Sequence, residues 1–534
     1  MYKKFFWLIS LCFLPALTGS AGADYFLGDD FESYSGTPDL QDTWDPTGAT
    51  DTYYSLDITF VHMGSKSLEI WYENNYAPPY YCGVSRTLDT PADWTLLGTA
   101  EGLSLWFRGS PNADQMYVRL KDSSDREAVV KYTDFWDPAN LVLEQWQRWK
   151  INFGYFTDNN SNFDLTAVEM LEIGIGEPVG AAPGVPGGGQ VYLDDIKIYQ
   201  HQCDFSEGDS EADINKDCVV GWDEVNVMAD EWLDDDYNIE ADINRDGKVD
   251  FGDHAVMANN WRDTGSKIYE CDYWQTLHPE WIFCDDFETT APLVGTGRYF
   301  EYSNDEGDFI PLNGVGFDGS RGMRVIFQAG EVSAGSLHLG FGRVPQGYFN
   351  KGIRNTEDFR EIYYRMYLKN QDGWVGSPAK LSRAFSFASS TSWAQAMIAH
   401  LWSSGDYLLV DPASGVVDGV VVTTKYNDFP NLHWLGSQAG ITPIFDSAHD
   451  DTWFCIEHHI KLNDPGESNG IQEFWIDGQL EARRTGLNFV DTWTDYAINA
   501  VYLENYWNSG SSQLQERYFD NFVVSTQPIG CIEN

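Results

Sequence analysis

One pattern of oxygen-bearing residues is written twice near the middle of the chain. The first copy runs from Asp213 to Glu224 and the second from Asp242 to Asp253. Each copy has Asp or Asn at positions 1, 3 and 5, an apolar residue at position 8 and a carboxylate at position 12. A twelve-residue loop needs this order to wrap one hard cation such as calcium. A single copy is often only a solvated turn, but the duplication favours two calcium sites between two larger domains.

A short helical pattern follows each loop, and no matching pattern precedes it. One helical face is formed after the first loop by Val225, Met228 and Trp232, and after the second by His254, Met257 and Trp261. This doubled unit resembles a type I dockerin, the module that docks enzymes onto cohesin-bearing scaffolds in cellulosomal systems. The resemblance implies a calcium cofactor and a cohesin-like scaffold protein as partner.

The resemblance also implies a ligand set for each loop. The first loop would supply the side chains of Asp213, Asn215, Asp217 and Glu224 and the carbonyl oxygen of Val219. The second would supply the side chains of Asp242, Asn244, Asp246, Asp250 and Asp253 and the carbonyl oxygen of Lys248. In the first loop Cys218 replaces the usual glycine at position 6, and Gly221 has no side chain at position 9. We therefore expect the second loop to bind calcium more tightly.

The sequence indicates the metal that this module binds more clearly than it indicates the module's protein partner. Trp222 and Phe251 stand where cohesin-binding dockerins often have small hydroxyl residues. The module also lies inside the chain, so the alternative role is a calcium-stiffened spacer between two domains.

Length and charge bound the rest. A chain of 534 residues favours about three domains, and a hydrophobic content of 43% is enough to build real cores. The net charge of −49 argues against nucleic acid and anionic membranes as partners, because such binding depends on cationic contacts.

The first residues carry an export pattern. Lys3 and Lys4 precede an apolar run at 5–17, and the small residues at 21–23 fit a cleavage site, so we expect a signal peptide over 1–23. No later stretch is long and apolar enough to predict a membrane span. The expected location is extracellular, with periplasmic retention or the cell surface left open.

Cysteine usage fits an oxidising compartment. Removal of Cys12 with the signal leaves an odd number of cysteines, so one thiol should remain unpaired. A bridge between Cys203 and Cys218 would tie the first loop to the end of the preceding domain. The other pairings stay open.

The two larger domains read as antiparallel β-sandwiches. Residues 24–200 contain short alternating runs at 66–72, 103–107 and 116–120, and residues 284–534 contain similar runs at 360–368, 452–462 and 473–478. The predicted layout is a sandwich at 24–200, a small helical dockerin-like domain at 201–265, a linker at 266–283 and a second sandwich at 284–534. The fold class is therefore mainly β.

Both sandwiches open and close with similar acidic segments. Residues 29–32 (DDFE) and 285–288 (DDFE) open them, and residues 192–196 (YLDDI) and 518–522 (YFDNF) close them. First and last strands usually lie side by side in a jelly roll, which would gather these carboxylates. Solvated strand ends and a shared cation are both open interpretations. The segments of the first domain resemble jelly-roll carbohydrate-binding modules, which implies an aromatic platform on which sugar rings stack. We expect this platform in the loop at 76–81.

The second sandwich resembles concanavalin A-like polysaccharide lyases and their non-catalytic relatives. The resemblance rests on the segments 319–325, 380–381, 453–466, 474–479 and 518–521. A lyase must neutralise a uronic carboxylate, take the C5 proton and protonate the leaving oxygen. The candidate catalytic residues are Lys380, Arg383, His400, His459 and Tyr502. His458 faces the core side of its strand and is expected to be a hydrogen-bonded core histidine.

These observations predict a secreted, calcium-binding protein that acts on or binds extracellular polysaccharide. Lyase activity is the leading enzymatic hypothesis. Glycoside hydrolysis would need two facing carboxylates, for which Glu457 and Glu473 are the available pair. The rivals are a non-catalytic glycan-binding protein and a dockerin-mediated assembly protein of the cell surface.

Overall fold

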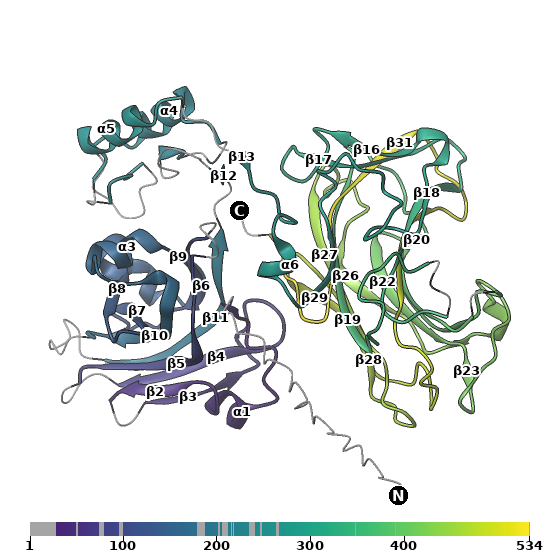
Figure 1. Cartoon of the computed structure of the whole chain (residues 1–534), viewed down its shortest axis with the longest axis horizontal. Coiled ribbons are helices and arrows are strands. Elements are labelled where there is room, and N and C mark those ends of the chain that lie inside the picture. The colour runs from purple at the N-terminus through teal and green to yellow at the C-terminus, as the bar shows by residue number, and fades with distance from the viewer. Residues whose placement is uncertain are drawn as a thin grey trace, which may run out of the picture. The chain divides into compact units, whose positions relative to one another are not determined.

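A computed structural model describes residues 28–49, 52–73, 79–95, 100–178, 187–200, 203–204, 212–214, 216, 218–233, 241–245, 248–262, 266–345, 347, 349–389 and 391–532. The expected signal peptide, the first half of the loop at 76–81 (76–78) and the ligands Asn215, Asp217 and Asp246 lie outside these residues. The chain forms two compact units (Figure 1). Unit 1 comprises residues 1–201 and 205–264, and unit 2 comprises residues 202–204 and 265–534.

Unit 1 contains two antiparallel sheets that share one hydrophobic core, as the alternating runs predict. One sheet has the strand order β3-β4-β11-β6-β9, with β1 paired to β11, and the other has the order β2-β5-β10-β7-β8. The strands are β1 (Gly28–Asp29), β2 (Asp45–Gly48), β3 (Tyr53–Asp57), β4 (Ser67–Glu73), β5 (Tyr81–Ala92), β6 (Ala100–Arg108), β7 (Met116–Asp122), β8 (Glu127–Lys131), β9 (Trp146–Asn152), β10 (Val168–Gly176) and β11 (Gly188–Gln200). The short helices are α1 (Thr37–Gln41), α2 (Tyr132–Phe135), η2 (Pro138–Val142), α3 (Phe153–Asn159) and η3 (Leu165–Ala167).

The described parts of the calcium-loop segment contain two helices, α4 (Trp222–Asp230) and α5 (Phe251–Asn259). Each begins at position 10 of its loop. Met228 and Met257 are buried in a small core of their own, which confirms them as the packing residues of the repeat. The expectation for His254 was wrong, because this side chain is exposed. Val256 packs against the core, so the buried face of α5 is rotated away from His254.

Unit 2 contains two larger antiparallel sheets. The first has the order β16-β17-β31-β19-β27-β28-β29, with β14 paired to β31, and the second has the order β15-β18-β30-β20-β21-β22-β25, with β26 paired to β22. The strands up to β21 are β12 (Cys203–Asp204), β13 (Ser266–Lys267), β14 (Trp281–Asp285), β15 (Glu301–Ser303), β16 (Phe309–Asn313), β17 (Arg321–Phe327), β18 (Ser333–Gly340), β19 (Glu361–Asn370), β20 (Lys380–Phe387) and β21 (Gln395–Ser404). The later strands are β22 (Tyr407–Ser414), β23 (Val416–Val417), β24 (Val420–Val421), β25 (His433–Trp434), β26 (Gln438–Pro443), β27 (Trp453–Lys461), β28 (Gly470–Ile476), β29 (Gln479–Leu487), β30 (Ala500–Tyr506) and β31 (Gln515–Ser525). The short helices are α6 (Trp274–Leu277), η5 (Asp305–Gly307) and η6 (Phe429–Asn431).

The core of unit 2 lies between its two sheets. His458 of β27 is fully buried there, with Nδ1 2.6 Å from the hydroxyl of Tyr364 and Nε2 2.9 Å from the side-chain nitrogen of Gln472. The prediction of a hydrogen-bonded core histidine is confirmed. The described helices include none with the length and hydropathy needed to cross a lipid bilayer.

The two sandwiches repeat one detail of their strand ends. β1 pairs with β11 in unit 1, and β14 pairs with β31 in unit 2, so the opening and closing segments do lie side by side. Phe31 and Phe287 have φ of 59° and 60°, and Asp195 and Asn521 both have φ of 46°. Left-handed backbone is uncommon at residues other than glycine. Its recurrence at matched positions shows that the opening and closing segments follow one plan.

Disulfide bonds account for most of the described cysteines. Cys271 is bonded to Cys284, and Cys455 is bonded to Cys531. Cys203 and Cys218 are also disulfide-bonded. Cys82 is the free, buried thiol among the described residues, so the expectation of one unpaired cysteine holds there.

Candidate functional site

Four of the five candidate catalytic residues lie on one sheet of unit 2. Lys380 and Arg383 are on β20, His400 is on β21 and Tyr502 is on β30. Arg383 is the register partner of both Tyr502 and His400. Residues directly opposite each other in antiparallel strands project to the same face of the sheet. The fold therefore gathers on one face residues that lie far apart in the sequence.

A row of register partners on this face extends across six strands. Successive register partners are Glu301, His338, Tyr502, Arg383, His400 and Asp411. We call these six residues the polar row. Beside it runs an apolar row of register partners made of Ala500, Phe385, Ile398, Ala413 and Trp434. Most of both rows is buried: the apolar row, apart from the exposed Trp434, belongs to a second hydrophobic cluster of unit 2.

Arg383 organises the centre of this face. It is fully buried and forms an ion pair with Glu504, to which Nε donates over 2.5 Å. Nη2 donates to the hydroxyl oxygen of Tyr426 over 2.6 Å, and Nη1 donates to the side-chain oxygen of Asn427 over 2.7 Å. Its charge is already matched inside the protein, so Arg383 positions neighbouring groups.

His400 is also buried beneath the face. Its Nδ1 donates to the carbonyl oxygen of Asp411 over 2.8 Å, and the ring of Trp434 stacks on it at 5.4 Å. Its Nε2 has no hydrogen-bond partner among the described residues. Burial, reinforced by Arg383, lowers the pKa of His400 well below its usual value, so the imidazole is neutral. Burial also raises the pKa of Asp411 to about 6.

Lys380 is the half-buried cation of this face. Its ammonium lies 4.4 Å from the ring centroid of Tyr506 and 6.0 Å from that of Phe429. Burial, with a smaller contribution from Arg383, lowers the pKa of Lys380. A lysine with a lowered pKa exists in both protonation states more readily. Its ammonium form can bind a substrate carboxylate, and its neutral amine form can accept a proton.

Exposed rings border the same region. Tyr426, Phe429 and Trp434 have 37%, 37% and 43% of their surface exposed, and we call them the aromatic rim. Phe429 stacks on Trp434 at 6.0 Å. Exposed rings beside polar side chains are the usual means of holding sugar rings, since aromatic faces pair with apolar C–H faces.

Tyr502 and His338 extend the polar row toward β15. Their rings stack at 3.7 Å, and Nδ1 of His338 lies 3.0 Å from the carboxylate of Glu301. Tyr502 is 2% exposed, and burial raises its pKa well above the usual value. Tyr502 therefore stays protonated. Its main contribution is a flat ring on which the imidazole of His338 stacks.

His459 is not part of this face, because it lies on β27 in the other sheet of unit 2. Its Nδ1 lies 2.8 Å from Glu473 and its Nε2 2.9 Å from Glu361. Burial alone would lower the pKa of His459, but these two carboxylates raise it. Glu457, the other half of the carboxylate pair considered for glycoside hydrolysis, accepts backbone hydrogen bonds from Ile529 and Gly530 at 2.8 Å each. Both carboxylates of that pair are thus engaged in structural contacts.

Sequence reasoning missed several members of the face. Glu504 and Tyr506 alternate with the predicted Tyr502 on β30, so the period of two could have found them. Tyr426 and Asn427 lie in an irregular segment between β24 and β25, where no periodicity reveals which side chains turn inward. Only the tertiary contact with Arg383 singles them out.

Three of the described carboxylates in the loops at 213–224 and 242–253 are fully buried. Asp213, Glu224 and Asp253 have no exposed surface. Asp253 accepts backbone hydrogen bonds from Asn244 at 3.0 Å and Asp250 at 2.8 Å. Oε1 of Glu224, at position 12 of the first loop, is buried and has no partner among the described residues. A buried carboxylate oxygen without a partner is costly, so this donor set fits a hard cation.

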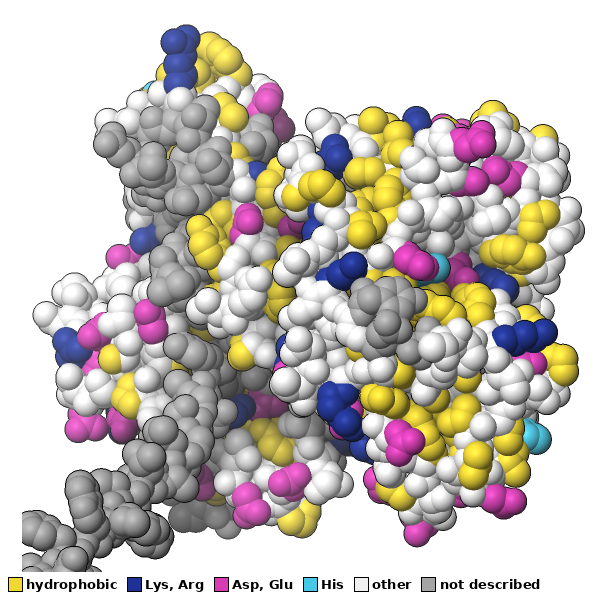
Figure 2. All heavy atoms as spheres, turned by 45° about the vertical axis from the view of Figure 1, so that its right-hand side comes forward, with side chains coloured by type: hydrophobic (Ala, Val, Ile, Leu, Met, Phe, Trp, Pro, Cys, Tyr) yellow, Lys and Arg dark blue, Asp and Glu magenta, His cyan; other side chains and the backbone are white. Residues whose placement is uncertain are grey.

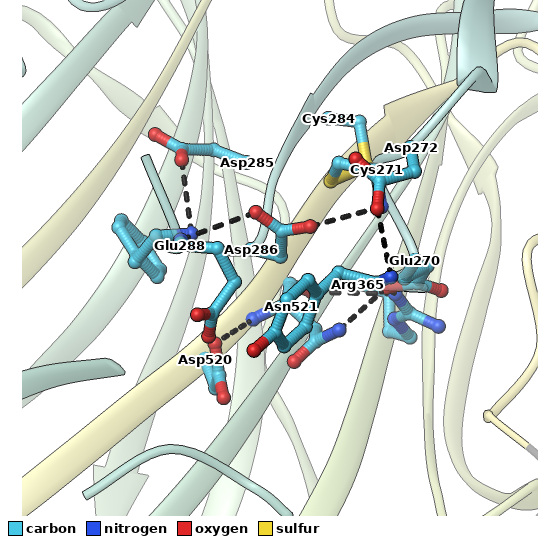
Figure 3. The surroundings of a disulfide bond; sticks show 12 residues. Glu270, Cys271, Asp272, Cys284, Asp285, Asp286, Glu288, Arg365, Asp520 and Asn521 are labelled. Carbon is cyan, nitrogen blue, oxygen red and sulfur yellow. Dashed lines mark hydrogen bonds and ion pairs between the residues drawn. A yellow bond between two sulfur atoms is a disulfide. The ribbon is translucent and has the colours of Figure 1, made fainter. Parts of the chain in front are cut away.

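A second acidic cluster lies at the joined strand ends of unit 2. Figure 3 shows Asp286, Glu288 and Asp520 around β31, next to the Cys271–Cys284 bond. Asp286 accepts backbone hydrogen bonds from Cys271 at 3.0 Å and Glu288 at 3.2 Å. Burial and neighbouring carboxylates raise the pKa of Asp286 to about 6 and that of Asp520 to about 8. In unit 1 the same causes raise the pKa of Asp30 to about 7.

Figure 2 shows that acidic side chains on the presented surface are scattered, with hydrophobic patches and Lys or Arg side chains between them. The large negative charge is therefore not one continuous block on that surface.

No protein-family model and no curated protein matches the chain. Among solved structures, an endo-β-1,4-glucuronan lyase from the fungus Trichoderma reesei is similar at 11% identity and a TM-score of 0.33, covering 46% of this chain and 95% of that chain. Alginate lyase vAL-1 from Chlorella virus is similar at 13% identity and a TM-score of 0.29, covering 41% and 89%. A family 11 carbohydrate-binding module of a Clostridium thermocellum cellulase is similar at 14% identity and a TM-score of 0.23, covering 32% and 92%.

Proposed function

We propose that unit 2 binds a uronic-acid-containing polysaccharide through Lys380, Asn427 and the aromatic rim and cleaves it by β-elimination. The observation that carries the proposal is the convergence of Lys380, Tyr426 and Asn427 around the buried Arg383–Glu504 pair. An amine base, a protonated phenol and an amide can together carry out elimination next to a carboxylate. The aromatic rim supplies a surface for neighbouring sugar rings.

Each group has a role that follows from its surroundings. The amide of Asn427 gives its oxygen to Arg383, which leaves its N–H groups to bind the uronate carboxylate and stabilise the charge that develops during proton removal. Lys380, with its lowered pKa, takes the C5 proton. Burial raises the pKa of Tyr426, so its phenol is protonated and can donate to the leaving oxygen. The C4–O bond breaks as the C4=C5 double bond forms.

The proposal for the rest of the chain follows the sequence. The loops at 213–224 and 242–253 bind calcium, which would neutralise their buried carboxylates and hold the loops in shape. The protein works outside the cytoplasm. The dockerin-like segment docks a cohesin-like scaffold or, as the alternative, spaces the two units, and binding of a cohesin domain distinguishes the two roles.

A non-catalytic glycan-binding role is the second candidate. It is favoured by one observation: Arg383 and His400 are both fully buried, so neither can touch a substrate directly. In that case Lys380, Asn427 and the aromatic rim hold a polysaccharide without cleaving it.

The experiment that separates the two uses the full chain with glucuronan, alginate and polygalacturonate, following the ultraviolet absorbance of the unsaturated product. We expect product from one of these polymers, and at least about a hundredfold loss in Lys380→Met and Tyr426→Phe, as is typical when an acid or base is removed. Lys461→Met and Tyr518→Phe, on the other sheet, are matched controls and should retain activity. Absence of product from every polyuronate, together with retention on immobilised polymer, would favour the binding role.

A further inference from the structure

Two large aromatic side chains are exposed side by side on the first sandwich. Tyr53 on β3 and Trp71 on β4 are direct register partners, with 57% and 47% of their surface exposed. Adjacent strands lie about 4.8 Å apart, so the two rings occupy neighbouring places on one face of the sheet. Among the described residues, neither ring packs against another aromatic ring, and both stay largely exposed. The fold therefore makes little use of these rings.

Hydrogen-bonding groups stand next to the ring pair. Gln190 on β11 is the register partner of Trp71, which extends the row to three strands. Gln190 donates to the carboxylate of Glu69 over 2.7 Å, and Tyr192 donates to the same oxygen over 3.1 Å. Ser55 donates to the other oxygen over 3.1 Å. Three donors from two strands, β3 and β11, fix the orientation of Glu69 beside the rings.

This combination indicates the chemistry of the ligand. Exposed rings at neighbouring places offer stacking surfaces to the C–H faces of sugars, and a fixed carboxylate and amide offer partners to hydroxyl groups. Among the described residues no cation forms an ion pair with Glu69, and the chain as a whole carries a charge of −49. A polyanionic glycan would be repelled here, whereas a neutral one would be accepted.

We propose that Tyr53, Trp71 and Gln190, with Glu69 beside them, form a binding site for a neutral polysaccharide. The site is separate from the face of unit 2, and the proposal does not depend on whether unit 2 is a lyase. The protein would then recognise two chemically different glycans, a neutral one through unit 1 and an acidic one through unit 2.

The opposite sheet of unit 1 provides the internal comparison. Its outer face carries a polar cluster in which Tyr117 and Arg119 both donate to Glu172, at 2.5 and 2.8 Å. Tyr117 and Glu172 are buried, at 0% and 3% exposure, and Tyr81 packs edge-on against Tyr117 at 5.8 Å. The groups of this cluster are satisfied by one another, in contrast to the rings of Tyr53 and Trp71.

Affinity electrophoresis of the full-length protein tests the proposal. Gels would contain hydroxyethylcellulose, mixed-linkage β-glucan, xylan or galactomannan, with polygalacturonate as the acidic comparison. We expect at least one neutral polymer to retard the protein, and Trp71→Ala and Tyr53→Ala to weaken the binding by about tenfold or more, equivalent to about 1.4 kcal/mol. Tyr273→Ala, which removes a ring of 56% exposure from unit 2, is the matched control and should leave binding unchanged. Both rings are exposed, so the variants should fold, as circular dichroism would verify.

Three outcomes would overturn the proposal. The first is that no neutral polymer retards the wild-type protein. The second is retardation that survives both ring substitutions but is lost in Tyr81→Ala, which would assign binding to the opposite sheet. The third is loss of neutral-glycan binding in Trp434→Ala, which would assign it to unit 2. Lyase activity measured on the same variants distinguishes failure of this site from failure of the proposed function.

Discussion

Trp222, at the start of α4, packs edge-on against Trp261, which follows α5, with ring centroids 5.3 Å apart. Phe251, at the start of α5, packs in the same way against Trp232, which follows α4, at 5.1 Å. The sequence repeat thus becomes a reciprocal contact in which the start of each helix meets the end of the other. Trp222 and Phe251 remain 74% and 77% exposed, so one side of each ring contact faces solvent.

This reciprocity predicts the effect of removing one ring. Trp261→Ala and Trp232→Ala should each destabilise the small helical core by about 1–2 kcal/mol, less than a fully buried ring because these contacts are half-exposed. Loss of protection of the α4 and α5 amides in hydrogen exchange is the measurement. Leu233→Ala, at 71% exposure, should have little effect. Equal protection in all three variants would contradict the reciprocal contact.

Calcium binding should be unequal between the two loops. The second loop keeps its side-chain ligand at position 9, Asp250, whereas Gly221 stands at that place in the first. Isothermal titration calorimetry should therefore resolve a tighter and a weaker site. Asp253→Asn should remove the tighter one and Glu224→Gln the weaker one. Two equivalent sites, or none, would contradict this prediction.

Stability should fall with rising pH when divalent cations are absent. The folded pKa of Asp30, Asp286 and Asp520 is raised to about 7, 6 and 8 from an ordinary value of 3.8. The folded protein thus holds these protons more tightly than the unfolded chain does. The associated stability is fully present below about pH 4 and is lost as the pH rises toward 8.

Thermal denaturation in chelator should accordingly show a Tm that decreases between pH 5 and 8. Asp520→Asn, which stays neutral, should lose part of that decrease. If the joined strand ends share a cation, calcium should abolish the decrease in the wild-type protein and much less so in the variant. A Tm that is flat in chelator would show that the strand ends are simply solvated.

Breaking the buried ion pair of unit 2 should be expensive. Glu504→Gln leaves the guanidinium of Arg383 buried without a counter-charge, which typically costs about 3–5 kcal/mol. Asp358→Asn breaks the exposed pair with Arg343 and should cost less than about 1 kcal/mol. Urea denaturation monitored by fluorescence would measure both. Similar midpoints for the two variants would contradict the central position of Glu504.

The sequence predicted only some of the residues of the candidate site. Lys380, Arg383, His400 and Tyr502 were proposed from the chemistry of their side chains, and the fold places all four on one sheet. His459 was chosen on the same grounds, yet it lies on the other sheet among carboxylates. Period-two alternation tells which side of its own strand a residue faces, but the strand's place in the sandwich depends on long-range pairing.

The sequence by itself determined the duplicated calcium-loop pattern, the mainly β class and the matching strand ends of the two sandwiches. These features are local, because they depend on residue spacing and alternation along one segment. The tertiary structure decided that Arg383 is paired with Glu504 and positions Tyr426 and Asn427, and that Tyr53 and Trp71 stand together on an open face. Such relationships arise where strands distant in sequence come into register, and no short stretch of the chain encodes them.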